Sequence, residues 1–86
     1  MASELLNLYG RAWCHLCDDM RAALAPLQAE LGFELAYFDV DEHPHLEARY
    51  DELVPVLTAG QGDGERELCH YHLDEAAVRA HFANFR

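Results

Sequence analysis

The chain contains no lysine, and its fixed positive charges are six arginines scattered among sixteen aspartates and glutamates. The formal net charge is therefore -10 at pH 7. Such a surface repels phosphate groups, so it disfavours nucleic-acid binding and attachment to an acidic membrane. We expect the charge to serve mainly for solubility, with steering towards a basic partner as the alternative.

Long hydrophobic runs are absent as well. No segment approaches the roughly 20 apolar residues of a membrane span. The opening MASELLNLYG has neither a basic region nor an apolar stretch long enough for a signal peptide. We therefore expect a cytoplasmic protein with no membrane partner. A length of 86 residues, of which 51% are hydrophobic, suits a single domain over residues 1–86.

Four short segments rich in apolar residues are predicted as strands, at 4–9, 33–40, 54–59 and 67–72. A helix between the first two predicts a right-handed crossover and parallel pairing. The glycine-rich loop GQGDG between the last two predicts an antiparallel hairpin. The predicted class is α/β, with a mixed four-stranded sheet in the order β-α-β-α-β-β-α.

Helical periodicity separates these strands. Apolar residues spaced by three and four predict a helix over 14–31 that ends at Gly32 and that Pro26 loosens near Ala22. A short helix is expected within 41–50, with Pro44 in its first turn. Further expectations are that Asp41 or His43 caps the short helix, that Asp74 caps a last helix, and that the core includes Tyr37, Phe38, Phe82 and Phe85.

Cysteine is scarce, and its odd count of three argues against a disulfide framework. Two of the three, Cys14 and Cys17, form a Cys-x-x-Cys pair. A zinc site needs four ligands, and Cys69 and His70 would point to opposite faces of a strand. A four-residue crosslink would contribute only about 2 kcal/mol of stability. Both structural interpretations of the pair are therefore weak, and no metal is expected.

Redox chemistry is favoured by the position of the pair, where a strand ends and a helix begins. The helix N-terminus places free N–H groups and the positive end of the dipole beside Cys14, which favours its thiolate. Cys17, one turn further on, is within reach for a disulfide but less accessible. We predict that Cys14 attacks a substrate disulfide and that Cys17 resolves the product.

The sequence resembles the thioredoxin superfamily, most closely small glutaredoxin-like proteins, over nearly its whole length. The matching features are the strand LLNLYG, the motif WCHLC opening a helix, VPVL after a second βα unit, and a closing hairpin and helix. The resemblance implies a thioredoxin/glutaredoxin-like fold with helices on both faces of the sheet. It also implies a dithiol disulfide oxidoreductase active in thiol-based electron transport.

The same resemblance implies several site residues. It suggests a cis peptide bond at Val54–Pro55, with backbone there binding an extended substrate. Arg11 stands where glutaredoxins often have a basic residue that contacts glutathione. The segment HYHLDEAA, however, lacks the Gly-Gly pair at which glutaredoxins bind the glutathione carboxylate.

Three neighbouring or related side chains have two interpretations each. Trp13 either covers the disulfide and lines a substrate groove or closes the strand end as a half-buried aromatic. His15 either stabilises the thiolate as an imidazolium or is an exposed residue without a role. Cys69 is predicted as a small buried strand residue, with a third redox thiol as the alternative.

The sequence thus predicts a monomeric thiol–disulfide oxidoreductase without a bound cofactor. Its expected partner is a disulfide-containing protein or glutathione, and its reductant is glutathione or a thiol reductase. Two alternatives from other classes stay open. One is an iron–sulfur or metal carrier that uses Cys14, and the other is an interaction module on a redox fold without significant activity.

Overall fold

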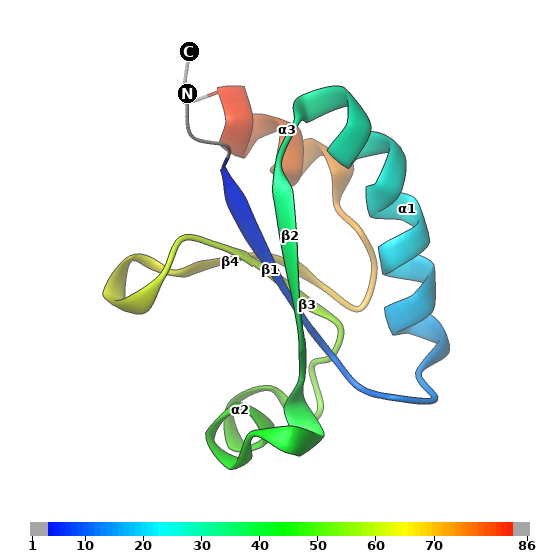
Figure 1. Ribbon diagram of the computed structural model, residues 1–86, viewed down its shortest axis with the longest axis vertical. Coiled ribbons are helices and arrows are strands. Elements are labelled where there is room, and N and C mark those ends of the chain that lie inside the picture. The colour runs from blue at the N-terminus through cyan, green and yellow to red at the C-terminus, as the bar shows by residue number, and fades with distance from the viewer. Residues whose placement is uncertain (1–3, 84–86) are drawn as a thin grey trace.

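The computed structural model describes residues 4–83, which form a four-stranded mixed sheet in the order β2-β1-β3-β4 (Figure 1). The edge strand β2 pairs parallel with β1, whereas β1–β3 and β3–β4 are antiparallel. This arrangement confirms the predicted α/β class and element order. The strands are β1 (Leu5–Gly10), β2 (Glu34–Asp39), β3 (Val56–Ala59) and β4 (Arg66–His70).

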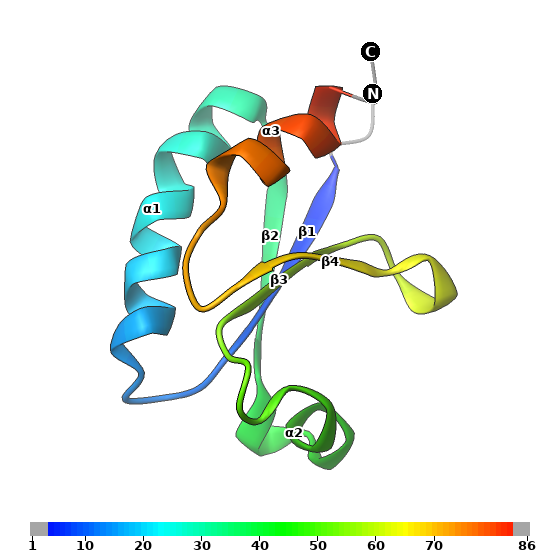
Figure 2. The same ribbon diagram turned by 180° about the vertical axis from the view of Figure 1, so that it is seen from behind.

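Helices cover both faces of the sheet, as expected. The helix α1 (His15–Leu31) lies beside α3 (Glu75–Ala83), while α2 (Pro44–Tyr50) lies apart from them at the far end of β2 (Figures 1 and 2). Two 3-10 turns complete the chain, η1 (Val40–Glu42) before α2 and η2 (Gly62–Gly64) in the hairpin loop. Among residues 4–83, no helix combines the length and the apolar character needed to cross a bilayer.

Strand alternation divides the core into two clusters. Leu6 and Leu8 of β1 face α1 and α3, and Tyr9, which follows them, faces α2. The larger cluster comprises Leu6, Leu8, Met20, Leu24, Leu27, Phe33, Leu57, Ala59, Cys69 and Val78. The smaller comprises Tyr9, Val40, Tyr50 and Val56.

Local signals explain the ends of α1. Gly32 adopts φ 76° and donates its N–H to the Gln28 carbonyl, so the helix ends where the glycine predicts. The helical backbone continues through the exposed Pro26, which lacks the N–H that the Ala22 carbonyl would otherwise accept. The proline therefore removes one hydrogen bond without ending the helix.

Asp74 makes its predicted capping hydrogen bond, whereas neither His43 nor Asp41 does so for α2. Asp74 accepts a hydrogen bond from the Ala77 N–H at 3.0 Å, as expected of an N-cap. His43 occupies the N-cap position of α2 but makes no capping hydrogen bond with its side chain. Asp41 does not cap α2 either, because it lies inside η1, whose own cap is Asp39.

Two strand boundaries and one core assignment were wrong. β3 begins at Val56, and β4 ends at His70 because Tyr71 adopts a left-handed φ of 64° that a strand cannot continue. Tyr37 was expected in the core but is 37% exposed. Phe38 and Phe82 are partly buried against the two clusters, and Phe85 lies outside the described residues.

A polar network closes the hairpin loop over the sheet. The Asn7 amide donates to Thr58 Oγ1 at 3.2 Å and to the Gly60 carbonyl at 2.9 Å. The hydroxyls of Tyr9 and Thr58 both donate to the Glu65 carboxylate. Buried polar groups of the central strands are thereby satisfied by the residues that flank the loop.

His81 makes the stability of the fold depend on pH. His81 is a buried residue of α3, and its Nδ1 lies 2.8 Å from Nη2 of Arg66. Burial is the largest cause that lowers the pKa of His81, and the Arg66 charge is the second. At acidic pH the unfolded chain therefore binds more protons than the folded chain. The free energy of unfolding is thus highest above the ordinary histidine range near pH 6.5, and it falls as the pH drops through that range. We expect a lower urea midpoint at about pH 5.5 than at about pH 8.

The control for this prediction is a pair of histidine variants measured at both pH values. His81→Gln should flatten the difference between the two urea midpoints, whereas His45→Gln, at an exposed position of α2, should retain it. An unchanged difference in His81→Gln would assign the acid sensitivity to other groups.

Candidate active site

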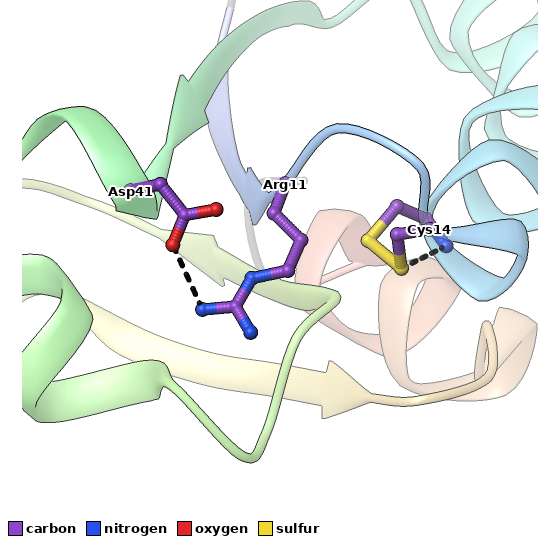
Figure 3. The surroundings of a disulfide bond; sticks show 4 residues. Arg11, Cys14 and Asp41 are labelled. Carbon is purple, nitrogen blue, oxygen red and sulfur yellow. Dashed lines mark hydrogen bonds and ion pairs between the residues drawn. A yellow bond between two sulfur atoms is a disulfide. The ribbon is translucent and has the colours of Figure 1, made fainter.

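The cysteine pair lies at the junction of β1 and α1. Cys14 is the N-cap of α1, with extended backbone, and its Sγ accepts the Cys17 N–H at 3.1 Å. Its carbonyl accepts the Asp18 N–H at 3.1 Å. The structure shows the two residues joined as a disulfide, with their Cα atoms 5.2 Å apart (Figure 3).

The two sulfur-bearing residues differ in their access to solvent. Cys14 is partly exposed, whereas Cys17 is completely buried. A thiolate on Cys14 would keep the N–H hydrogen bond and the positive end of the helix dipole, while Asp18 in the first turn would oppose it. The arrangement is thus able to separate an accessible thiolate from a protected thiol. His15 is the exposed first residue of α1.

Arg11 ties the loop before the cysteines to η1 and α2. Its Nη2 lies 3.1 Å from Asp41 Oδ1 and 2.7 Å from Asp51 Oδ1, and the Asp51 hydrogen bond is the largest cause that raises the Arg11 pKa. Figure 3 shows the side chain extending towards Asp41 and away from the disulfide. Two carboxylates of the chain therefore compensate the charge that the resemblance assigned to glutathione contact. Neither aspartate was predicted as its partner.

Strand register brings Pro55 to the end of the sheet from which the chain leaves β1 towards the cysteine pair. Tyr9 pairs with Val56, and Val56 pairs with His70, so the ends of β1 and β4 and the start of β3 coincide. The Val54–Pro55 peptide bond is cis. Val54 is partly exposed and Pro55 is buried.

Tyr71 holds the segment that leads to Pro55. Its N–H donates to the Pro55 carbonyl at 2.9 Å, and its hydroxyl donates to the Glu52 carbonyl at 2.8 Å. Sequence reasoning missed this role because Tyr71 was placed inside the last strand. No signal in HYH distinguishes a strand tyrosine from one that turns back onto a neighbouring loop.

Trp13 is 100% exposed, which excludes the interpretation of a half-buried aromatic at the strand end. Its φ of 60° lies in the left-handed region that side chains other than glycine rarely adopt. Within residues 4–83, the large exposed apolar side chains are Trp13, Tyr37 and Tyr71. They neighbour Cys14, Gly10 and Pro55 respectively, which all lie at the end of the sheet that carries the cysteine pair.

Cys69 is separate from the pair. It is a buried residue of β4 with a free thiol, and burial is the main cause that raises its pKa. It thus packs as a small strand residue in the larger core cluster. In the part of the chain that the structure describes, no three His, Cys, Asp or Glu residues come together as a metal site would require.

Comparison with known families gives one match that spans the described chain. The family described as "Glutaredoxin-like domain (DUF836)" matches residues 5–83. Uncharacterized proteins of Mycobacterium tuberculosis and Mycobacterium bovis are 34% identical over 88 residues, which cover 96% of this chain and 87% of theirs.

Solved structures share the fold. Protein Ne2328 from Nitrosomonas europaea is 41% identical with a TM-score of 0.82, over 94% of this chain and 93% of that one. Protein XcR50 from X. campestris is 37% identical with a TM-score of 0.67, over 92% and 96%. Oxidized mitochondrial thioredoxin 3 from Saccharomyces cerevisiae, at 17% identity, has a TM-score of 0.71 over 98% and 80%, which shows the thioredoxin fold alone.

Proposed function

The chain belongs to the glutaredoxin-like domain family, and from this premise we propose that it is a thiol–disulfide oxidoreductase acting through the Cys14/Cys17 couple. One observation carries the proposal. Cys14 is a partly exposed N-cap within disulfide distance of Cys17, which is completely buried. An accessible sulfur stabilised by N–H groups, backed by a protected second sulfur, suits stepwise thiol–disulfide exchange.

In the proposed reaction the Cys14 thiolate attacks one sulfur of a substrate disulfide. A mixed disulfide forms at Cys14, and the other substrate sulfur leaves with the electron pair as a thiolate. Cys17 then attacks Cys14, which closes the intramolecular disulfide and releases the second substrate thiolate. The substrate gains two electrons, and the cysteine pair loses two, so an external thiol must reduce the pair before the next cycle.

The surroundings of the pair supply the proposed substrate contacts. Trp13, next to Cys14 in the sequence, is wholly exposed, and the partly exposed Val54 precedes β3 at the end of the sheet where β1 ends. His15 lies beside Cys14 and supports the thiolate when protonated. We propose a protein disulfide as substrate for a monomeric enzyme in the cytoplasm, where such thiols stay reduced.

Charge bears on the choice of reductant. Glutathione carries two carboxylates and one ammonium group, while Arg11 is already compensated by Asp41 and Asp51. The net charge of -10 also disfavours an anionic ligand. We therefore propose a thiol reductase as the main electron donor and glutathione as a weaker alternative, with no resident cofactor.

Trapping of mixed disulfides tests the proposal. Cys17→Ser removes the resolving thiol, so a substrate should remain attached to Cys14 and appear as a band that dithiothreitol removes. Cys14→Ser should capture nothing, and Cys69→Ser on top of Cys17→Ser should capture as much as Cys17→Ser alone. If Cys17→Ser captures neither protein nor glutathione, the oxidoreductase proposal is wrong.

A further inference from the structure

Because Gly10 has no side chain, the Tyr37 hydroxyl and the Cys17 sulfur can both lie close to it. A Cβ placed on Gly10 would lie 2.7 Å from the Tyr37 hydroxyl oxygen and 3.1 Å from Cys17 Sγ. Both atoms therefore approach the same point at the end of β1, which only a residue without a side chain leaves open. Tyr37 reaches it from β2, opposite Leu8 and on the face of the sheet that α1 covers.

The buried sulfur of Cys17 requires a hydrogen-bond donor when it ionises. Its side chain is completely removed from solvent in the disulfide form. The proposed reaction requires Cys17 to become a thiolate, and a buried anion without a hydrogen-bond donor is costly. The Tyr37 hydroxyl is a hydrogen-bond donor that approaches the same point beside Gly10 as that sulfur.

The surroundings of Tyr37 favour its protonated form, which can donate a hydrogen bond. The Arg21 guanidinium of α1 lies 4.5 Å from the ring centroid and packs over its face. Burial is the largest cause that raises the pKa of Tyr37, with the Arg21 charge opposing and the Asp39 and Asp18 charges adding to the rise. The phenol therefore keeps its proton at neutral pH.

We propose that the Tyr37 hydroxyl donates a hydrogen bond to the Cys17 thiolate and so sets how readily Cys17 resolves a mixed disulfide. The role in turnover rests on the proposed oxidoreductase function, whereas the effect on Cys17 ionisation does not. Tyr37 keeps its own proton throughout. The proton that Cys17 loses goes to solvent, the Cys17–Cys14 bond forms, and the bond from Cys14 to the substrate sulfur breaks.

The test titrates Cys17 directly and needs no substrate. In the Cys14→Ser/Cys69→Ser background Cys17 is the sole thiol of the chain, and thiolate absorbance near 240 nm against pH follows its ionisation. Adding Tyr37→Phe should raise the pKa of Cys17 by roughly one unit, which is about tenfold less thiolate at neutral pH. Serine at position 14 remains a good N-cap, so α1 should keep its start.

Other charges near the pair are controlled by the shared background. The charged residues acting on Tyr37 are Asp18 and Arg21 of α1 and Asp39 of β2, and all three are present in every variant compared. His15 is likewise common to every variant compared. Tyr50→Phe, which removes a phenol from the cluster on the opposite face of the sheet, should leave the Cys17 titration unchanged.

Gly10→Ala provides a second, less selective arm, because its methyl group crowds the Cys17 sulfur as well as the phenol. The new methyl group should push the phenol away from the sulfur, so the Cys17 pKa should rise as in Tyr37→Phe, and combining the two should add little. Equal Cys17 titrations with and without the Tyr37 hydroxyl would overturn the proposal. A Tyr37 effect in a protein that traps no substrate would instead sustain this inference and remove the oxidoreductase function.

Discussion

Replacing Cys14 with serine should abolish disulfide reduction, lowering kcat/KM for an insulin-type or small aromatic disulfide by about 10³-fold or more. A serine hydroxyl is essentially un-ionised at neutral pH, and the N–H donors of a helix terminus shift ionisation far too little to change that. The measurement is steady-state reduction with dithiothreitol as electron donor, which bypasses the choice of physiological reductant.

The cause of this loss is separable from loss of structure. Serine is among the preferred N-cap residues and can accept the Cys17 N–H hydrogen bond that Cys14 accepts now. The variant should therefore unfold at nearly the same urea concentration as the reduced wild type, with both measured in dithiothreitol. Cys69→Ser, which changes a buried thiol outside the pair, should retain most activity. Full activity in Cys14→Ser would assign the chemistry to another group.

Leu24→Ala should destabilise the fold by about 2–5 kcal/mol, the usual range for emptying a fully buried leucine site. Leu24 has no exposed surface and lies in the larger core cluster, between α1 and the two central strands. A domain of this size is stable by roughly 5–10 kcal/mol, so the loss is a large share of the total. The melting temperature should fall by roughly 10–30 °C.

The matched control for Leu24→Ala is Leu31→Ala, in the last turn of the same helix. Leu31 is partly exposed and packs at the border of the cluster, so its truncation leaves a smaller cavity and should cost clearly less. Thermal unfolding followed by circular dichroism at one protein concentration gives both values. Equal losses at the two positions would mean that burial in the cluster does not set the stability of α1.

Much of the fold follows from local patterns. Periods of two and of three to four residues separate β1, α1 and β2, and Gly32 ends α1 through a conformation that glycine adopts without strain. Asp74 caps α3 for a similarly local reason. The start of β3 and the end of β4 were misplaced. β4 stops early because Tyr71 leaves the strand to bond Pro55 and Glu52, which lie far from it in sequence.

The candidate site likewise combines features that local sequence predicts with features that only the fold creates. The sequence by itself determined that Cys14 and Cys17 stand at a strand-to-helix junction, since spacing and helix periodicity are properties of neighbouring residues. Only the tertiary structure decided that Arg11 is compensated by Asp41 and Asp51, that Trp13 is wholly exposed, and that the Tyr37 hydroxyl and the Cys17 sulfur both lie beside Gly10. The two ion pairs of Arg11 join residues 30 and 40 positions apart, and Tyr37 approaches Gly10 from a different strand. They depend on strand register and on the space that Gly10 leaves open, which no local pattern encodes.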